Sequence, residues 1–149
     1  MLLLSLASAL ALTASEAETV AGLIERLEPQ AGGFAYDEEE ADRLYDEDEA
    51  ADGLIAAAGF DRDAWRAALD ATFRGFLAAL PEEEFTATVS TLRARLDASR
   101  SITEEQRAAL LEMVVENVGR LETMREEGAR DAAAVRPLVP RIRRLSGGD

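Results

Sequence analysis

The sequence predicts an all-α protein, built as a small antiparallel bundle of three to four helices. Apolar residues recur three and four positions apart, which is the helical period, in segments 61–80, 82–98 and 104–127. Connections of one residue (81) and five residues (99–103) separate these segments, and such short connections make neighbouring helices antiparallel. Sustained alternation of apolar and polar residues is missing, so no sheet is predicted. We also expect a short N-terminal helix or signal segment and an irregular basic C-terminal tail.

Segment 61–80 carries the clearest helical pattern in the chain. Asp61 can cap its N-terminus, and Pro81 ends it because a residue before proline resists the α conformation. Its apolar stripe consists of Trp65, Ala68, Leu69, Thr72, Phe73, Phe76, Leu77 and Leu80. A continuous stripe of this kind predicts a core-facing helix.

Two further segments complete the predicted bundle core. Segment 82–98 begins with three glutamates, and its stripe has the 4-3-4 spacing of a bundle seam. That stripe is Phe85, Val89, Leu92 and Leu96. Segment 104–127 follows a capping box formed by Thr103 and Gln106, and Gly128 closes or bends it. Its repeating apolar residues are Leu111, Val114, Val118 and Leu121.

Residues 37–52 form an acidic segment that holds most of the negative charge. Ten of the sixteen residues are acidic and one is arginine, so the segment contributes −9 to the net charge of −14. Acids in a first turn favour a helix, which Asp37 can cap. We predict a marginal fourth helix over 38–58, interrupted by Asp48 and ended by a left-handed Gly59. Its core-facing residues would be Leu44, Tyr45, Leu54 and Ile55.

Residues 1–17 fit a signal peptide. Met1–Ala14 is apolar, and Ser15-Glu16-Ala17 fits a small-x-small cleavage pattern, although no basic residue precedes them. Cleavage there would leave a single helical domain, 18–149, located in the periplasm or secreted. The alternative is a first helix capped by Ser15 and Glu18. In either case, the helical stripe that follows ends at Pro29.

Residues 136–149 form a basic tail after Asp131, which can cap a last short helix. Pro137 and Pro140 prevent a regular continuation of that helix. The candidate partner-binding residues are the arginines of the tail, Arg136, Arg141, Arg143 and Arg144. Because the tail is opposite in charge to the acidic segment, the two can attract each other within one chain or between copies.

The composition excludes several kinds of chemistry. The chain has no cysteine and no histidine, and all sixteen basic residues are arginine. Thiolate and imidazole ligands, a cysteine nucleophile and the commonest general base are therefore missing. The net charge of −14 disfavours nucleic acid and anionic membranes. We expect a non-enzymatic protein without a resident cofactor or an integral membrane span in the mature chain, which binds a protein partner or itself.

Calcium is an alternative ligand of the acidic segment, because hard cations prefer several carboxylates on a flexible loop. An EF-hand register that begins at Asp48 places Gly53 correctly, but it lacks the third-position ligand and the final glutamate. Low-affinity binding through Asp46, Asp48 and Asp52 is the metal hypothesis that remains.

The segment Ile102-Thr103-Glu104-Glu105-Gln106 resembles the LTxxQ motif of small periplasmic helical proteins related to the Spy and CpxP chaperones. The resemblance covers five residues, with isoleucine in place of leucine and one motif where the family has two. It implies a second alternative, a periplasmic chaperone or stress-adaptor protein. The chain is acidic, whereas these chaperones present a basic concave face.

Overall fold

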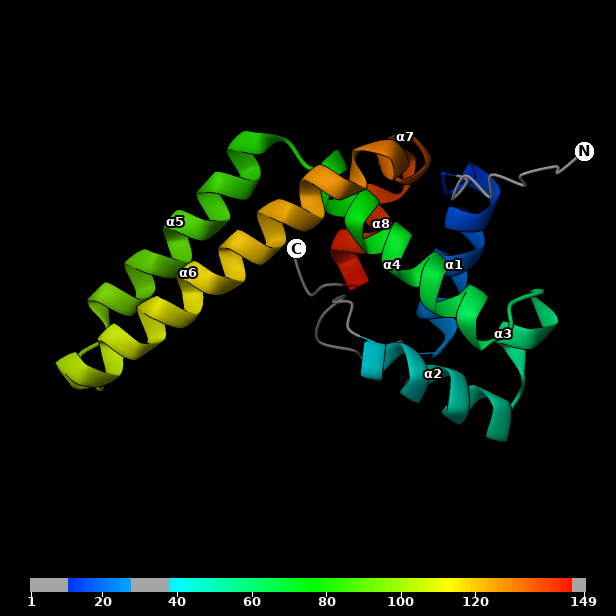
Figure 1. Cartoon of the computed structure of the whole chain (residues 1–149), viewed down its shortest axis with the longest axis horizontal. Coiled ribbons are helices and arrows are strands. Elements are labelled where there is room, and N and C mark those ends of the chain that lie inside the picture. Colours follow the sequence, from blue (N-terminus) through cyan, green and yellow to red (C-terminus); the bar gives the residue numbers. More distant parts are fainter. Residues whose placement is uncertain (1–10, 28–37, 146–149) are drawn as a thin grey trace, which may run out of the picture.

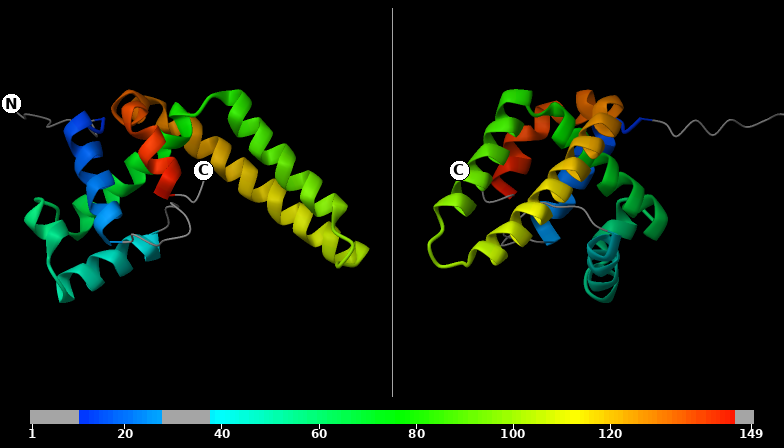
Figure 2. Two further views of the ribbon diagram at one scale, coloured as in Figure 1. Left: turned by 180° about the vertical axis from the view of Figure 1, so that it is seen from behind. Right: turned by 60° about the vertical axis from the view of Figure 1, so that its left-hand side comes forward.

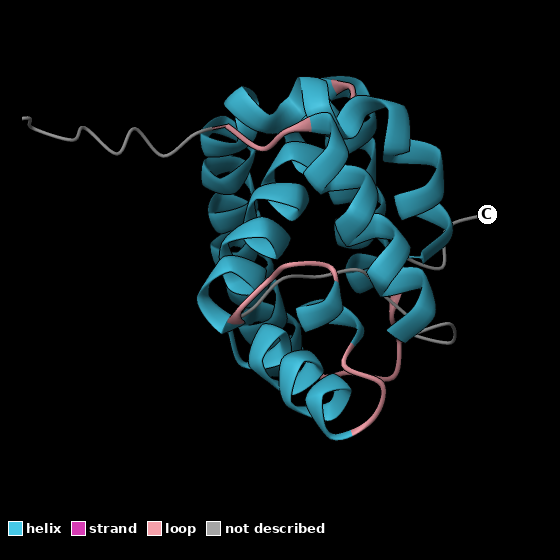
Figure 3. Ribbon diagram, turned by 90° about the vertical axis from the view of Figure 1, so that its right-hand side faces the viewer, coloured by secondary structure: helices cyan, strands magenta, loops and turns pink. Residues whose placement is uncertain are grey.

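The computed structural model describes residues 11–27 and 38–145, and the regular structure in these ranges is entirely helical (Figure 3). The all-α prediction is therefore confirmed. The helices are α1 (Ala14–Leu27), α2 (Glu38–Ala50), α3 (Leu54–Ala57), α4 (Arg62–Ala79), α5 (Glu82–Ala98), α6 (Glu104–Glu127), α7 (Ala132–Val135) and α8 (Val139–Leu145), with 3₁₀ turns at Gly128–Asp131 and Arg136–Leu138. The predicted helix end at Pro29 and the predicted cap at Asp37 lie outside the described residues.

Helix α4 is the central element of a packed body that also contains α1, α2, α3, α7 and α8 (Figure 1). As predicted, Asp61 caps it, since its carboxylate accepts the N–H of Ala64 at 2.8 Å. Its first half packs Trp65 into a cluster with α1, α2 and α3, and its second half packs Phe73 into a cluster with α1, α7 and α8. Helix α4 therefore connects both parts of the core.

Two glycines allow the backbone of α4 to approach the segment after α6. A Cβ at Gly128 would lie 2.0 Å from the carbonyl oxygen of Arg74, and one at Gly75 would lie 2.8 Å from Val135 Cγ2. The sequence predicted only that Gly128 closes or bends a helix. The structure shows why a glycine is needed at this position. The two backbones are in contact there, and a larger residue would force them to shift.

Helices α5 and α6 project from the body as a long antiparallel hairpin (Figures 1 and 2). Their boundaries match the predicted segments, and the Thr103–Gln106 capping box is present with both of its hydrogen bonds. The predicted bundle of three to four helices is not confirmed. Helix α4 packs on Gly128–Asp131, α7 and the C-terminal end of α6, whereas α5 makes its main contacts with α6 alone.

The C-terminal residues are also more ordered than predicted. An irregular tail is not confirmed, because residues 136–145 are helical and bury Leu138, Val139 and Ile142. Pro137 lies at the start of a 3₁₀ turn and Pro140 in the first turn of α8. A proline in a first turn removes an N–H that has no intrahelical acceptor, so the helix tolerates it.

The N-terminal segment packs against α7 and the residues around it. Leu12 is buried, and its N–H donates to Asp131 Oδ1 at 2.7 Å. Asp131 thus binds the start of α1 and makes no side-chain cap for α7. The Glu16 N–H donates to Thr13 Oγ1 at 3.1 Å, so Thr13 caps α1, and the alternative cap at Ser15 is wrong. Cleavage after Ala17 stays a prediction.

None of the helices in the described ranges is long and apolar enough to cross a lipid bilayer.

Candidate functional site

The acidic segment forms α2, which packs one face onto the body. Ala41 and Leu44 are buried, and Trp65 Nε1 donates to the Ala41 carbonyl at 3.1 Å. This confirms that the segment is the polar side of a helix. The single helix predicted over 38–58 is wrong, because Gly53 at φ +63° separates α2 from α3. Gly59 at φ +99° follows α3 in the predicted left-handed conformation. The Phe60 N–H reaches back to the Ile55 carbonyl at 3.2 Å.

Two arginines of α4 compensate the carboxylates of α2. Arg66 donates from Nε and Nη2 to the two oxygens of Asp42, at 2.6 and 2.5 Å. This hydrogen-bonded pair lowers the pKa of Asp42 and raises that of Arg66. Arg62 pairs with Asp46 and approaches Asp42 at 3.5 Å. These pairs are exposed to solvent, which screens them, so each contributes little to stability.

The three candidate calcium ligands occupy separate positions. Asp46 pairs with Arg62, and Asp52 is exposed at the turn after α2. Asp48 is buried and caps α3, since its carboxylate oxygens accept the N–H groups of Leu54 at 2.9 Å and Ile55 at 2.7 Å. Within residues 11–27 and 38–145, no three acidic side chains are placed to hold a metal ion. A cation bound by Asp48 would compete with the cap of α3.

The arginines of the C-terminal segment divide into two groups. Arg141 Nε and Nη2 donate to the two carboxylate oxygens of Glu25 at 2.9 and 3.1 Å, which lowers the pKa of Glu25. Arg143 pairs with Glu84 at the start of α5. Arg136 and Arg144 are exposed. Among the described residues, the arginines of the tail therefore pair with glutamates of α1 and α5. The aspartates of the acidic segment pair with arginines of α4 instead.

Two arginines of α6 hold the hairpin at its ends. Arg125 Nη1 donates to the carbonyls of Leu77 and Leu80 at the end of α4, and its guanidinium lies 5.6 Å from the centre of the Phe85 ring. Arg107 Nη2 donates to the Ser99 carbonyl at the end of α5, at 2.7 Å. Cations suit helix C-termini, where carbonyls lack intrahelical donors. Sequence reasoning missed both contacts, because each joins segments that are separate in the chain.

The hairpin carries a groove of about 140 Å³ along one side of its seam. Its lining is mostly aliphatic, contains no charged side chain and is formed by Phe85, Thr88, Val89, Leu92, Val114, Asn117, Val118 and Leu121. Leu92 is 45% exposed. The sequence predicted the stripe that contains Leu92 but placed it inside a bundle.

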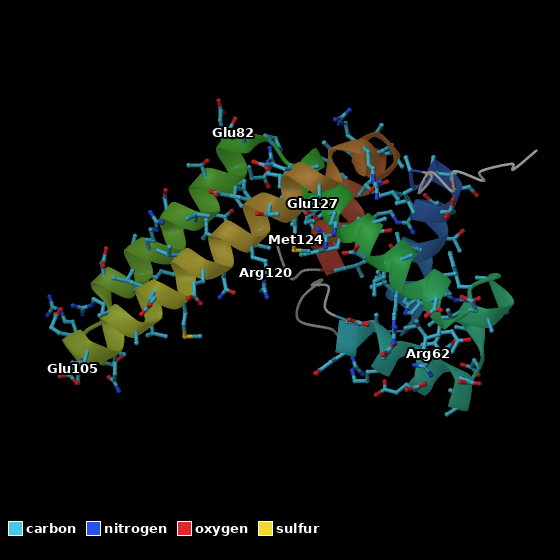
Figure 4. All side chains as sticks on the ribbon, viewed as in Figure 1. Arg62, Glu82, Glu105, Arg120, Met124 and Glu127 are labelled. Atoms are coloured by element: carbon cyan, nitrogen blue, oxygen red, sulfur yellow. The ribbon has the colours of Figure 1, made fainter. Side chains whose placement is uncertain are left out.

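Charged side chains of both signs flank this groove. Arg95 follows Leu92 by three positions, and Arg120 follows Asn117 by three, so each lies on the same helix face as a lining residue. By the same spacing, Glu84 and Glu122 lie on the faces of Thr88 and Val118. Met113, four positions before Asn117, is 57% exposed. Arg120 and Met124 extend from one side of α6 (Figure 4). We call the eight lining residues together with Arg95, Met113 and Arg120 the groove face.

A depression at the base of the hairpin, next to the groove, is acidic. It is lined by residues of α4, α5, α6 and the turn after α6, which are Ala78, Glu82, Phe85, Thr86, Glu122, Arg125, Glu126 and Ala129. Three glutamates and one arginine contribute to it, whereas the eight residues that line the groove carry no charge. The hairpin therefore has an apolar groove and, beside it, a depression with a net negative charge.

No protein-family model, characterised protein or solved structure shows significant similarity to this chain. The LTxxQ-like segment occupies the tip of the hairpin, where Thr103 and Gln106 cap α6.

Proposed function

We propose that the chain is an exported, non-enzymatic protein that binds other proteins through the groove face. The observation that carries this proposal is the lack of burial in the hairpin. Helix α5 has no buried residue among its seventeen, although its stripe has the spacing of a bundle seam. Its stripe is half-buried at Phe85, Val89 and Leu96 and exposed at Leu92. An apolar stripe that its own chain leaves incompletely buried is typical of an interaction surface.

The partner we expect is an amphipathic helical segment with acidic flanks. Apolar residues at helical spacing can fill the space beside Leu92 and Val114, as in helix-in-groove recognition. Acidic side chains at the edges of such a helix would face Arg95 and Arg120, which adds charge complementarity. Each apolar side chain that becomes fully buried stabilises the complex by about 1.5–3 kcal/mol before the costs of association. We expect no nucleic acid to bind, because most of the surface repels polyanions.

A photo-crosslinking residue introduced into the chain in its native host tests this surface. We place the photoreactive side chain at Leu92 in the groove and, as a matched control, at Val115. Val115 is an apolar residue of α6 that is 57% exposed and does not line the groove. Both positions are exposed, so neither substitution should disturb folding. We expect protein adducts from position 92 and few from position 115.

The mass of the adduct distinguishes the possible occupants. One defined partner mass supports recognition of a specific protein, and a doubled mass identifies a second copy of this chain. A broad smear of masses supports the chaperone alternative, which substoichiometric protection of an unfolded model protein against aggregation would then test. The proposal is wrong if position 92 gives no adducts or gives the same adducts as position 115.

A further inference from the structure

The residue before the cap of α1 is anchored by one buried carboxylate. Leu12 is 8% exposed and belongs to the core cluster around Phe73. Its backbone N–H donates to Asp131 Oδ1 at 2.7 Å, across 119 positions of sequence. Thr13 then caps α1, so Leu12 directly precedes the capping residue of the first described helix. Ala11, immediately before Leu12, is exposed and lies outside any helix.

Asp131 has few partners for a buried acid. It is 2% exposed, and its Oδ2 lies 3.7 Å from Nε of Arg130, whose own side chain is 60% exposed. The Leu12 N–H is the hydrogen-bond donor that reaches it from the described residues. A carboxylate can accept about four hydrogen bonds, and its burial is costly unless charge or donors compensate it. The site can therefore accept more donors and a positive charge at the position of the Leu12 nitrogen.

The sequence before Leu12 has the form of a cleavage site. Ala9 and Ala11 place small residues three and one positions before the Ala11–Leu12 bond, after an apolar run. The site predicted after Ala17 has the same small-x-small form, but Ala17 is fully buried inside α1. Cleavage there would remove Leu12, the Thr13 cap and the first turn of α1. Cleavage after Ala11 removes none of these contacts.

We propose that the Ala11–Leu12 peptide bond is a processing site and that the new N-terminus of Leu12 forms an ion pair with Asp131. Water and an export peptidase of the host hydrolyse the bond, which leaves a carboxylate on Ala11 and an α-amino group on Leu12. That amino group takes up a proton, because its ordinary pKa lies near 8. An ammonium group has three N–H donors and a full charge where the peptide had one neutral N–H. Processing thus strengthens the contact between α1 and the segment that follows α6.

The first test is the N-terminus of the protein made by its native host. Intact mass and N-terminal sequencing of the exported protein should give a chain that begins at Leu12. A chain that begins at Glu18 or at any other residue overturns the processing site and leaves export intact. A chain found only unprocessed inside the cell overturns both this site and the proposed export.

The second test isolates the charge of the new N-terminus. Two chains that begin at Leu12, one with a free amine and one N-acetylated, keep every described helix and differ in the charge beside Asp131. We expect the free amine to raise the Tm by about 5 °C. In an Asp131→Asn background the difference should disappear. Equal Tm values for the two wild-type chains would overturn the ion pair, and this comparison holds even if Asp131→Asn does not fold.

Discussion

The packed body and the projecting hairpin contain helices of similar sequence pattern but very different burial. Helix α4 buries eight of its eighteen residues, whereas α5 buries none of its seventeen. Both have apolar residues at helical spacing, and both have acids in the first turn. An amphipathic stripe therefore predicts that a helix face can be buried, but the stripe does not say whether the chain itself supplies the partner. The face left open is the one we propose for binding.

Backbone proximity is one physical source of the difference. In the body, Gly75 and Gly128 bring α4 and the segment after α6 into direct contact. The hairpin also has a glycine, Gly119, but a Cβ there would meet nothing within 4 Å. Gly119 faces open space and Gly128 faces a backbone. Substituting each of them in turn therefore compares the two regions directly.

The largest effect is expected from Gly128→Ala in the body. The new Cβ would overlap the Arg74 carbonyl oxygen, so α4 and the turn must separate, at a cost of about 3 kcal/mol. The matched control is Gly119→Ala in the hairpin, which should stabilise the protein by about 0.5–1 kcal/mol through helix propensity. Urea unfolding of both variants measures the contrast. Similar changes in the free energy of unfolding would show that the two regions are packed alike.

An intermediate effect is expected at Asp48. Asp48→Ala leaves the N–H groups of Leu54 and Ile55 without their acceptor and should lower the free energy of unfolding by about 2 kcal/mol. Asp52→Ala, at an exposed position, should change it by less than about 0.5 kcal/mol. Thermal unfolding with and without millimolar Ca²⁺ should show no rise in Tm for the wild-type chain. A rise that both variants abolish would instead support the calcium hypothesis.

A small, pH-dependent effect is expected from Glu25. The folded-state pKa of Glu25 is lowered by Arg141, so this pair stabilises the fold above the unfolded-state pKa, near 4.5. The contribution is lost as the pH falls through the lowered, folded-state pKa. Between pH 5 and pH 3, wild-type protein should therefore lose more stability than Glu25→Gln. Glu105 lies at the hairpin tip and makes no ion pair with the described residues (Figure 4). The Glu105→Gln variant should therefore lose as much stability as the wild type over this pH range.

The features predicted correctly from the sequence are local. Asp61, Gly59 and the Thr103–Gln106 capping box act on residues within four or five positions, and such patterns can be read directly. Pro81 ends α4 for an equally local reason. The boundaries of α4, α5 and α6 were therefore predictable.

The features that were missed depend on contacts between distant segments. Asp48 looked like a break in an apolar stripe, but it caps a separate helix that begins six residues later. Asp131 was expected to cap its own helix and binds Leu12 instead. The groove face escaped prediction for the same reason, since nothing in the stripe of α5 shows that α4 packs elsewhere. A signal for Asp48 did exist, because Gly53 marks a helix break just after it.

Amide hydrogen exchange of the full-length protein, resolved by residue, tests the contrast between body and hairpin most directly. Helix α4 should exchange only through global unfolding, because it contributes to both parts of the core. The middle of α5, around Leu92, should open locally and exchange at least about tenfold faster than the amides around Phe73. Equal protection in α4 and α5 would contradict the account, because the hairpin would then be buried as thoroughly as the body and its groove face would not be free to bind.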